Sequence, residues 1–293
     1  MKIGYFPGCS LYGSAKEYDL SLRTILQFFD VDLVEIEDWS CCGASSAHSV
    51  SHLLSVSLPA RNLALAQRQG LKEILVPCAA CYNRLVTAQY EINTRPELKK
   101  EVEDAIGDKL NDNAEIINII QLFQKIGAEK ITSQKKVNLQ GLKAACYYGC
   151  LLLRPNSITN FDDAEEPSSM EKIVSQTGAQ VVDWNFKTEC CGAAHTLTNT
   201  NIVTSLSKKI IDDAREHNAD VIITACPMCH SNLDMRQIAI KKEYPSHEYF
   251  PVFYITEIIG LSIGLDGKTL GTNLHFIDSS EAIVKALGSV KVL

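Results

Sequence analysis

The chain has 293 residues, of which 46% are hydrophobic, and a formal net charge of −7. This length leaves room for about two domains, and the acidic balance excludes a nucleic-acid binder that relies on a dense basic surface. Residues 1–9 lack the long apolar run of a signal peptide, and residues 252–265 are too short and too polar to span a bilayer. We therefore expect a cytoplasmic protein without a membrane span.

The first half of the chain alternates predicted strands and helices. Short buried or alternating apolar runs predict strands, and apolar residues at helical spacing predict helices. In chain order, the predicted elements are a strand at 2–6, a helix at 15–29, a strand at 31–36, a helix at 49–69, a strand at 73–76, helical residues 82–112 and an amphipathic helix at 115–127. Because helices join consecutive strands, we expect the strands to be parallel.

The second half repeats this order of elements. Its predicted elements are a strand and turn at 143–150, a polar loop at 154–168, a helix at 170–177, a strand at 180–184, a helix at 202–217, a strand at 220–224 and a helix at 253–264. We place the linker near residues 130–141 and predict two domains, 1–140 and 141–293. The predicted fold class is α/β, with two tandem, pseudo-symmetric, Rossmann-like repeats built on parallel sheets.

Ten of the eleven cysteines occupy matching places in the two halves. The first cysteine set is Cys9, Cys41, Cys42, Cys78 and Cys81, and the second cysteine set is Cys150, Cys190, Cys191, Cys226 and Cys229. Gaps of 31 and 35 residues separate the single cysteine, the Cys-Cys-Gly turn and the CxxC pair of the first set, and the second set has gaps of 39 and 34. In a reducing compartment, such a repeat favours metal or redox chemistry over disulfides.

Each set lies at the carboxyl ends of predicted strands, where parallel sheets bind their ligands. We therefore expect five thiols to converge in each half, near the interface between the repeats. A structural zinc site closes with four ligands, and iron–sulfur clusters suit thiolates better. A cubane with four irons also leaves one cysteine spare, so either one cysteine is a bystander or a sulfur bridges two irons. Helices predicted just after Cys42, Cys81, Cys191 and Cys229 would aim backbone amides at the sulfurs.

This duplicated pattern resembles the CCG-domain family, and specifically the B subunit of heterodisulfide reductase from methanogenic archaea. The resemblance implies that each set holds one non-cubane [4Fe-4S] cluster through its five cysteines, and that the two clusters face one cavity between the repeats. It also implies the reaction, which is reduction of the mixed disulfide of coenzyme M and coenzyme B during methanogenesis. Cys146 has no counterpart in the first half, and we interpret it as structural.

Both coenzymes are anionic, so binding of the predicted substrate requires basic residues near the clusters. Arg84, Arg154 and Lys187 are the nearest cations along the chain and are the candidate substrate-binding residues. His48 and His195 follow the two Cys-Cys-Gly turns and are the candidate catalytic proton donors. Each of the five also has an ordinary interpretation, as a solvated surface charge or as a capping or core histidine.

A glycine-rich GxGxxG turn is absent from the sequence, so flavin or nicotinamide binding is not indicated. Electrons must then come from another protein. The family implies a small iron–sulfur C subunit and a flavin-containing A subunit, within a complex that can include a hydrogenase or a formate dehydrogenase. Three alternatives stay open: a component for oxidation of lactate, glycolate or glycerol phosphate or for thiol-dependent fumarate reduction, a pure electron-transfer protein, and a zinc-bound structural protein.

Overall fold

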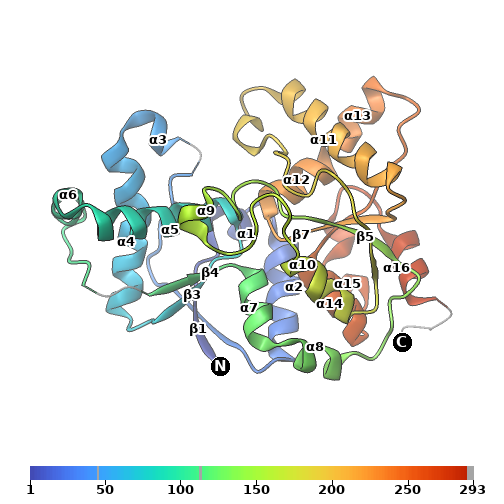
Figure 1. Cartoon of the computed structure of the whole chain (residues 1–293), viewed down its shortest axis with the longest axis horizontal. Coiled ribbons are helices and arrows are strands. Elements are labelled where there is room, and N and C mark those ends of the chain that lie inside the picture. The colour runs from blue at the N-terminus through green and yellow to red at the C-terminus, as the bar shows by residue number, and fades with distance from the viewer. Residues whose placement is uncertain (45, 112–113, 289–293) are drawn as a thin grey trace.

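The computed structural model describes residues 1–44, 46–111 and 114–288. It has the expected α/β class, with two tandem Rossmann-like repeats whose sheets lie on the left (β1, β3, β4) and on the right (β5, β7) in Figure 1. Each repeat contains a four-stranded sheet in which every pairing is parallel. The strand orders are β2-β1-β3-β4 and β6-β5-β7-β8, so the two repeats share one topology.

The first repeat places its longest helices between the strands. Its elements are β1 (Lys2–Tyr5), α1 (Gly8–Tyr12), α2 (Lys16–Gln27), β2 (Asp32–Glu35), α3 (Ala47–Val50), α4 (His52–Arg68), β3 (Glu73–Leu75), α5 (Ala79–Thr94), α6 (Pro96–Ile106), β4 (Glu115–Ile117), α7 (Ile119–Ile126) and α8 (Ala128–Gln134). The predicted helical stretch 82–112 is divided at Arg95, because Pro96 begins a new helix and cannot continue the old one.

The second repeat follows the same plan, with an added C-terminal segment. Its elements are β5 (Lys143–Tyr147), α9 (Asn156–Thr159), α10 (Ser169–Gln176), β6 (Gln180–Val181), the 3-10 turn η1 (Ala193–His195), α11 (Thr200–Glu216), β7 (Val221–Thr224), α12 (Pro227–Met235), α13 (Gln237–Glu243), β8 (Val252–Tyr254), α14 (Ile255–Ile263), α15 (Gly267–Leu270), the 3-10 turn η2 (Thr272–Leu274) and α16 (Ser280–Leu287).

The sequence prediction for 115–127 and 253–264 was wrong in part. Each predicted helix begins with a three-residue strand, β4 or β8, before α7 or α14 starts. A short apolar run does not distinguish a buried strand from a helix. Asn118 ends β4 and caps α7, since its side chain accepts hydrogen bonds from Ile120 and Gln121.

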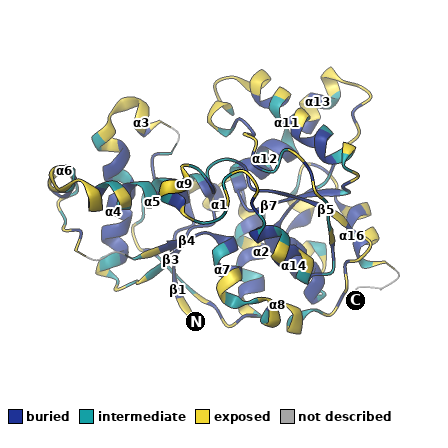
Figure 2. Ribbon diagram, in the orientation of Figure 1, coloured by how far each residue is buried: buried dark blue, intermediate teal, exposed yellow. Residues whose placement is uncertain are grey.

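Equivalent helices of the two repeats pack against each other crosswise. Helix α2 contacts α14, and α10, the counterpart of α2, contacts α7, the counterpart of α14. This exchange is what a pseudo-twofold axis between the repeats produces. All nine residues of α14 are buried, whereas Figure 2 shows exposed faces on the outer helices α6 and α13. The interface is therefore part of the core, and it brings the carboxyl ends of both sheets together.

Candidate functional site: two facing sets of cysteines

The first cysteine set gathers at the carboxyl ends of β1, β2 and β3. Cys9 lies in α1, directly after β1, and Cys78 is the residue that precedes the first turn of α5. The Sγ atoms of Cys42 and Cys81 are 3.2 Å apart, and the thiol of Cys41 forms a hydrogen bond with that of Cys42. Thiols separated by up to 39 positions in the chain are thus in direct contact.

The second cysteine set has the same arrangement. Cys191 and Cys229 are 3.6 Å apart between their Sγ atoms, and the thiols of Cys150 and Cys190 form a hydrogen bond. Cys226 precedes the first turn of α12 as Cys78 precedes that of α5. The expectation that five thiols converge in each half agrees with these contacts, and their role as metal ligands stays a prediction.

The two sets meet at the pseudo-twofold axis. Helix α5 packs against α12, and the thiols of Cys78 and Cys226, counterparts in the two repeats, are close enough for each to shift the pKa of the other. Contacts between neighbouring thiols therefore run without a break through the buried cysteines Cys42, Cys81, Cys78, Cys226, Cys229 and Cys191. Cys9, Cys41 and Cys190 are exposed at the two ends of this row, so the sites are open to solvent there.

Backbone amides point at the sulfurs in both halves. The amide of Gly43 donates to Cys41 Sγ at 3.4 Å, and that of Gly192 donates to Cys190 Sγ at 3.3 Å. The predicted positions of the helices were wrong in detail. Helix α3 begins only at Ala47, and a 3-10 turn precedes α11 in the second repeat, because the glycines adopt a left-handed conformation that does not continue into a helix. Cys81 and Cys229 lie inside α5 and α12.

Two glycines leave room for the sulfurs. Gly8 has φ +63°, and a Cβ atom there would lie 2.8 Å from Cys81 Sγ. Gly149 has φ +65°, and a Cβ atom there would lie 3.0 Å from Cys229 Sγ. Both positions require a left-handed residue without a side chain. Because equivalent glycines leave this space in both repeats, we infer that the backbone conformation sets the positions of these sulfurs.

The thiols cannot all ionise together. Hydrogen bonds from Cys41 and Cys81 lower the pKa of Cys42 to about 4, and the hydrogen bond from Cys150 is the main cause that lowers the pKa of Cys190 to about 6. Their neighbours respond oppositely, since hydrogen bonding to Cys42 raises the pKa of Cys81 well above the usual range. Like-charge repulsion between contacting sulfurs therefore has to be balanced by cations if all are to be thiolates.

The two candidate histidines lie on the exposed side of the site. His48 is in α3, after the first Cys-Cys-Gly turn, and His195 ends the 3-10 turn after the second. The charge of His195 contributes, after the Cys150 hydrogen bond and the Gly192 amide, to the lowered pKa of Cys190. His195 is thus close to a sulfur of the second set, and the catalytic role of both histidines stays a prediction.

The three candidate cations differ in their surroundings. Lys187 contacts Glu171 and Asp183, with a side chain that is 12% exposed. Arg154 donates to Thr188 Oγ1 and Glu165, and so braces the loop before the second Cys-Cys-Gly turn. Arg84 is half-buried in α5, one turn after Cys81, and no hydrogen bond or ion pair joins it to the residues that the structure describes.

The sequence prediction missed one residue near the boundary between the two sets, Tyr18. The Tyr18 hydroxyl donates to the carbonyl of Ala225 at 3.1 Å, and its ring stacks on Tyr254 at 4.0 Å between centroids. Burial raises the pKa of Tyr18, as do the charges of Cys226 and Cys78. The position of Tyr18 in the apolar pattern of α2 predicts only a buried residue, so no signal in the sequence indicated this contact. Cys146 is fully buried in β5, outside both sets.

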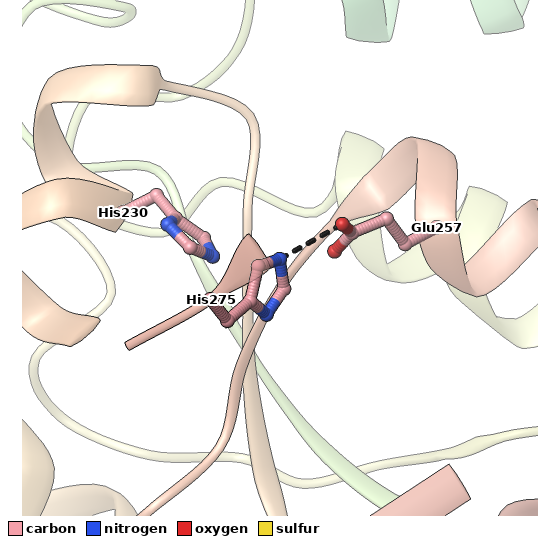
Figure 3. Close-up of side chains that lie close together, drawn as sticks. All are labelled: His230, Glu257 and His275. Atoms are coloured by element: carbon pink, nitrogen blue, oxygen red, sulfur yellow. Dashed lines mark hydrogen bonds and ion pairs between the residues drawn. The ribbon is translucent and has the colours of Figure 1, made fainter. Parts of the chain in front are cut away.

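A second group with metal-ligand chemistry, formed by His230, Glu257 and His275, lies in the second repeat (Figure 3). The ligand atoms of His230, Glu257 and His275 all lie within 4.8 Å of one another. One nitrogen of each histidine already has a protein partner, however, since His275 Nε2 donates to Glu257 at 2.9 Å and His230 Nε2 donates to the carbonyl of Val252 at 3.0 Å. Glu257 also accepts from the amide of Tyr254, at the start of α14. We assign this group a structural role as a buried ion pair.

The fold and the site together define a tandem α/β protein with two matched five-cysteine sites at its repeat interface. Residues 3–86 and 144–234 match the cysteine-rich CCG domain. The chain belongs to this family, as the sequence pattern predicted. The donor set fits the iron–sulfur clusters that the family implies, because thiolates are the usual ligands of such clusters and because amides and glycines here surround the sulfurs.

Similar proteins come from two kinds of enzyme. The chain is 33% identical to the 8-methylmenaquinol:fumarate reductase membrane anchor subunit of Wolinella succinogenes, over 96% of this chain and 98% of that protein. It is 30% identical to the B subunit of the ferredoxin/F420H2-dependent CoB-CoM heterodisulfide reductase of Methanosarcina acetivorans, over 97% of this chain and 96% of that protein. Both similar proteins are subunits of oxidoreductases.

One solved structure supports the fold alone. A hypothetical protein from Helicobacter pylori superposes with a TM-score of 0.74 at 12% identity, covering 94% of this chain, which spans about half (51%) of that protein. Within the described residues, none of the helices has the length and apolar character needed to cross a membrane.

Proposed function

We propose that the ten cysteines hold two non-cubane [4Fe-4S] clusters, five cysteines to each, and that the chain is the disulfide-reducing subunit of a heterodisulfide reductase. The observation that carries the proposal is that two sets of contacting sulfurs, with closest printed separations of 3.2 Å and 3.6 Å, meet where α5 packs against α12. When bound, the clusters supply one electron each and iron sites for two product sulfurs. The substrate in this proposal is the disulfide of coenzyme M and coenzyme B, in methanogenesis.

The reaction consumes two electrons and two protons and converts one disulfide into two thiols. The exposed side of the site, with Cys9, Cys41 and Cys190, is where the substrate enters in this proposal. Arg84 is the basic residue we assign to the anionic end of the substrate, since Arg154 and Lys187 already contact carboxylates. His195, near Cys190, is the residue we assign to deliver a proton to a departing thiolate.

The electrons come from partner proteins in this proposal. The similarity to subunits of heterodisulfide reductases supports partner subunits in general. We assign an iron–sulfur C subunit as the direct donor and a flavin-containing A subunit further upstream, within a complex that can include a hydrogenase or a formate dehydrogenase. The chain itself contains no GxGxxG turn for a nucleotide cofactor.

A second candidate function is the corresponding subunit of a quinol:fumarate reductase. The 33% identity to the Wolinella succinogenes protein supports it.

Anaerobic purification followed by iron and sulfide analysis and EPR tests the cluster proposal. We expect about four irons per repeat and an EPR signal that changes when either coenzyme thiol is added. Reduction of the heterodisulfide by the complex supports the first function, and fumarate reduction with a menaquinol analogue supports the second. Cys41→Ser or Cys190→Ser should lower iron content and activity, whereas Cys146→Ala should change neither. Intact iron content and rate in both serine variants would overturn the proposal, as would colourless, zinc-bound protein.

A further inference from the structure

The two cysteine sets have equivalent positions in the two repeats, but one neighbouring position holds a different type of residue in each repeat. The third residue after the last cysteine of each CxxC pair lies one helical turn further on, on the same face of α5 or α12. In the first repeat this residue is Arg84, and in the second it is Asn232. A cation and a neutral amide thus occupy equivalent places.

Asn232 is fully buried and bonded to the second Cys-Cys-Gly turn. Its Nδ2 atom donates to the carbonyl oxygen of Cys191 at 3.2 Å and to Cys191 Sγ at 3.6 Å. Its Oδ1 atom accepts from the hydroxyl of Thr196 at 2.9 Å. A carbonyl oxygen only accepts and the Thr196 hydroxyl donates, so the orientation of the amide group follows from its partners.

The partner that orients Asn232 is itself held by α12. Arg236, one turn after Asn232, donates to the carbonyl of Thr196 at 2.8 Å. Two side chains of one helix therefore fix the loop that leaves Cys191. The amide group of Asn232 therefore cannot rotate away from Cys191 Sγ without breaking a buried hydrogen bond.

The first repeat braces its turn differently. Asn62 of α4 accepts from the amide of Ser40 at 2.8 Å and donates to its carbonyl at 2.9 Å, and these contacts involve backbone only. Among the residues that the structure describes, no side-chain amide donates to a sulfur of the first set. Within the described part of the chain, the sulfur of Cys42 therefore receives a backbone hydrogen bond, from Ala44, but not the side-chain amide hydrogen bond that its counterpart Cys191 receives.

We propose that Asn232 is a positioning residue that makes the two cluster sites unequal, by holding Cys191 and by donating a hydrogen bond to its sulfur. The inference rests on the proposed function, because it requires a cluster in each set. A hydrogen bond to a ligating sulfur stabilises the more negative, reduced state and so raises the reduction potential. The cluster of the second repeat is then reduced at a higher potential than it would be without Asn232, and the described residues of the first repeat offer no equivalent side-chain amide.

The test is an EPR-monitored redox titration of Asn232→Leu and Thr196→Val in the purified complex. Leucine has the same branching as asparagine but removes all three amide contacts, and valine removes only the hydroxyl that orients the amide. We expect one of the two midpoint potentials to fall in Asn232→Leu, and to fall less in Thr196→Val, while the other stays unchanged. Asn62→Leu is the matched control, since it loosens the first turn without removing a sulfur contact, and it should leave both potentials in place.

Unchanged potentials in Asn232→Leu, a rise, or equal shifts of both clusters would overturn the inference. A second measurement does not depend on clusters. In iron-free protein, Asn232→Leu should speed hydrogen exchange at the amides of residues 191–196 relative to wild type, and Asn62→Leu should not. Wild-type protein that binds no iron would overturn the proposed function, and unaltered exchange in Asn232→Leu would overturn the brace separately.

Discussion

The thiols of Cys78 and Cys226 lie close together where α5 and α12 join the two repeats, and each shifts the pKa of the other. Because these residues are counterparts, each set contributes its innermost sulfur to a shared boundary. We predict that Cys78→Ser and Cys226→Ser each lose about half of the bound iron, since one cluster in two loses a thiolate ligand. Iron analysis per polypeptide, with EPR of the remaining cluster, measures this. Cys146→Ala is the control, and full iron retention in either serine variant would contradict the prediction.

Gly8 and Gly149 provide a second test of the same geometry. Alanine at either position places Cβ within 3.0 Å of a sulfur in a left-handed backbone. The conformation alone costs about 1–2 kcal/mol, and displacement of Cys81 or Cys229 should add the loss of about half of the iron. Gly70→Ala is a matched control, because Gly70 has φ +69° with nothing within 4 Å of the added Cβ. It should lose stability without losing iron, and equal iron loss in all three variants would refute the argument.

Local sequence patterns predicted the strands that carry the cysteines, because β1, β3, β5 and β7 are short apolar runs that end at cysteine or glycine turns. They failed for β4 and β8, where three apolar residues pass directly into an apolar helix. Three consecutive apolar residues fit a buried strand and a buried helix equally well. Only their pairing with β3 or β7 makes these segments strands.

The site could be predicted as two clusters of thiols but not as one continuous row. The contact between Cys78 and Cys226 depends on how α5 and α12 pack, and Tyr18 reaches Ala225 from 207 positions away. The sulfur contact of Asn232 likewise crosses 41 positions. Spacing within one repeat carries no information on contacts of this range, because packing between elements sets them.

Arg84 is the candidate anion-binding residue that the structure leaves without a described partner. We predict that Arg84→Gln raises KM for an anionic disulfide by about tenfold or more, because a charge-assisted hydrogen bond is worth about 1.5–3 kcal/mol. Steady-state kinetics against the ionic strength of the buffer measures the effect. Arg61→Gln serves as the control, since Arg61 pairs with Asp38 on the surface of the same repeat. Equal KM values for both variants would remove Arg84 from the site.

The ion pair of His275 and Glu257 makes stability depend on pH. Burial lowers the pKa of His275, but attraction to Glu257 and their hydrogen bond outweigh burial and raise it. A raised folded-state pKa adds stability that is complete below the unfolded value of about 6.5 and is lost as pH rises through the folded value. Burial also raises the pKa of Glu257, which acts in the same direction.

We therefore predict that the urea midpoint of the wild-type protein falls between about pH 6 and pH 9. His275→Gln should cost about 3–5 kcal/mol at pH 6, because it leaves one partner of a buried pair alone, and less at pH 9, where the histidine has lost its proton. The double variant Glu257→Gln/His275→Gln should lose less than the single variant at pH 6, since no carboxylate is left buried without its partner. An unchanged pH slope in His275→Gln would show that the pair does not carry this dependence.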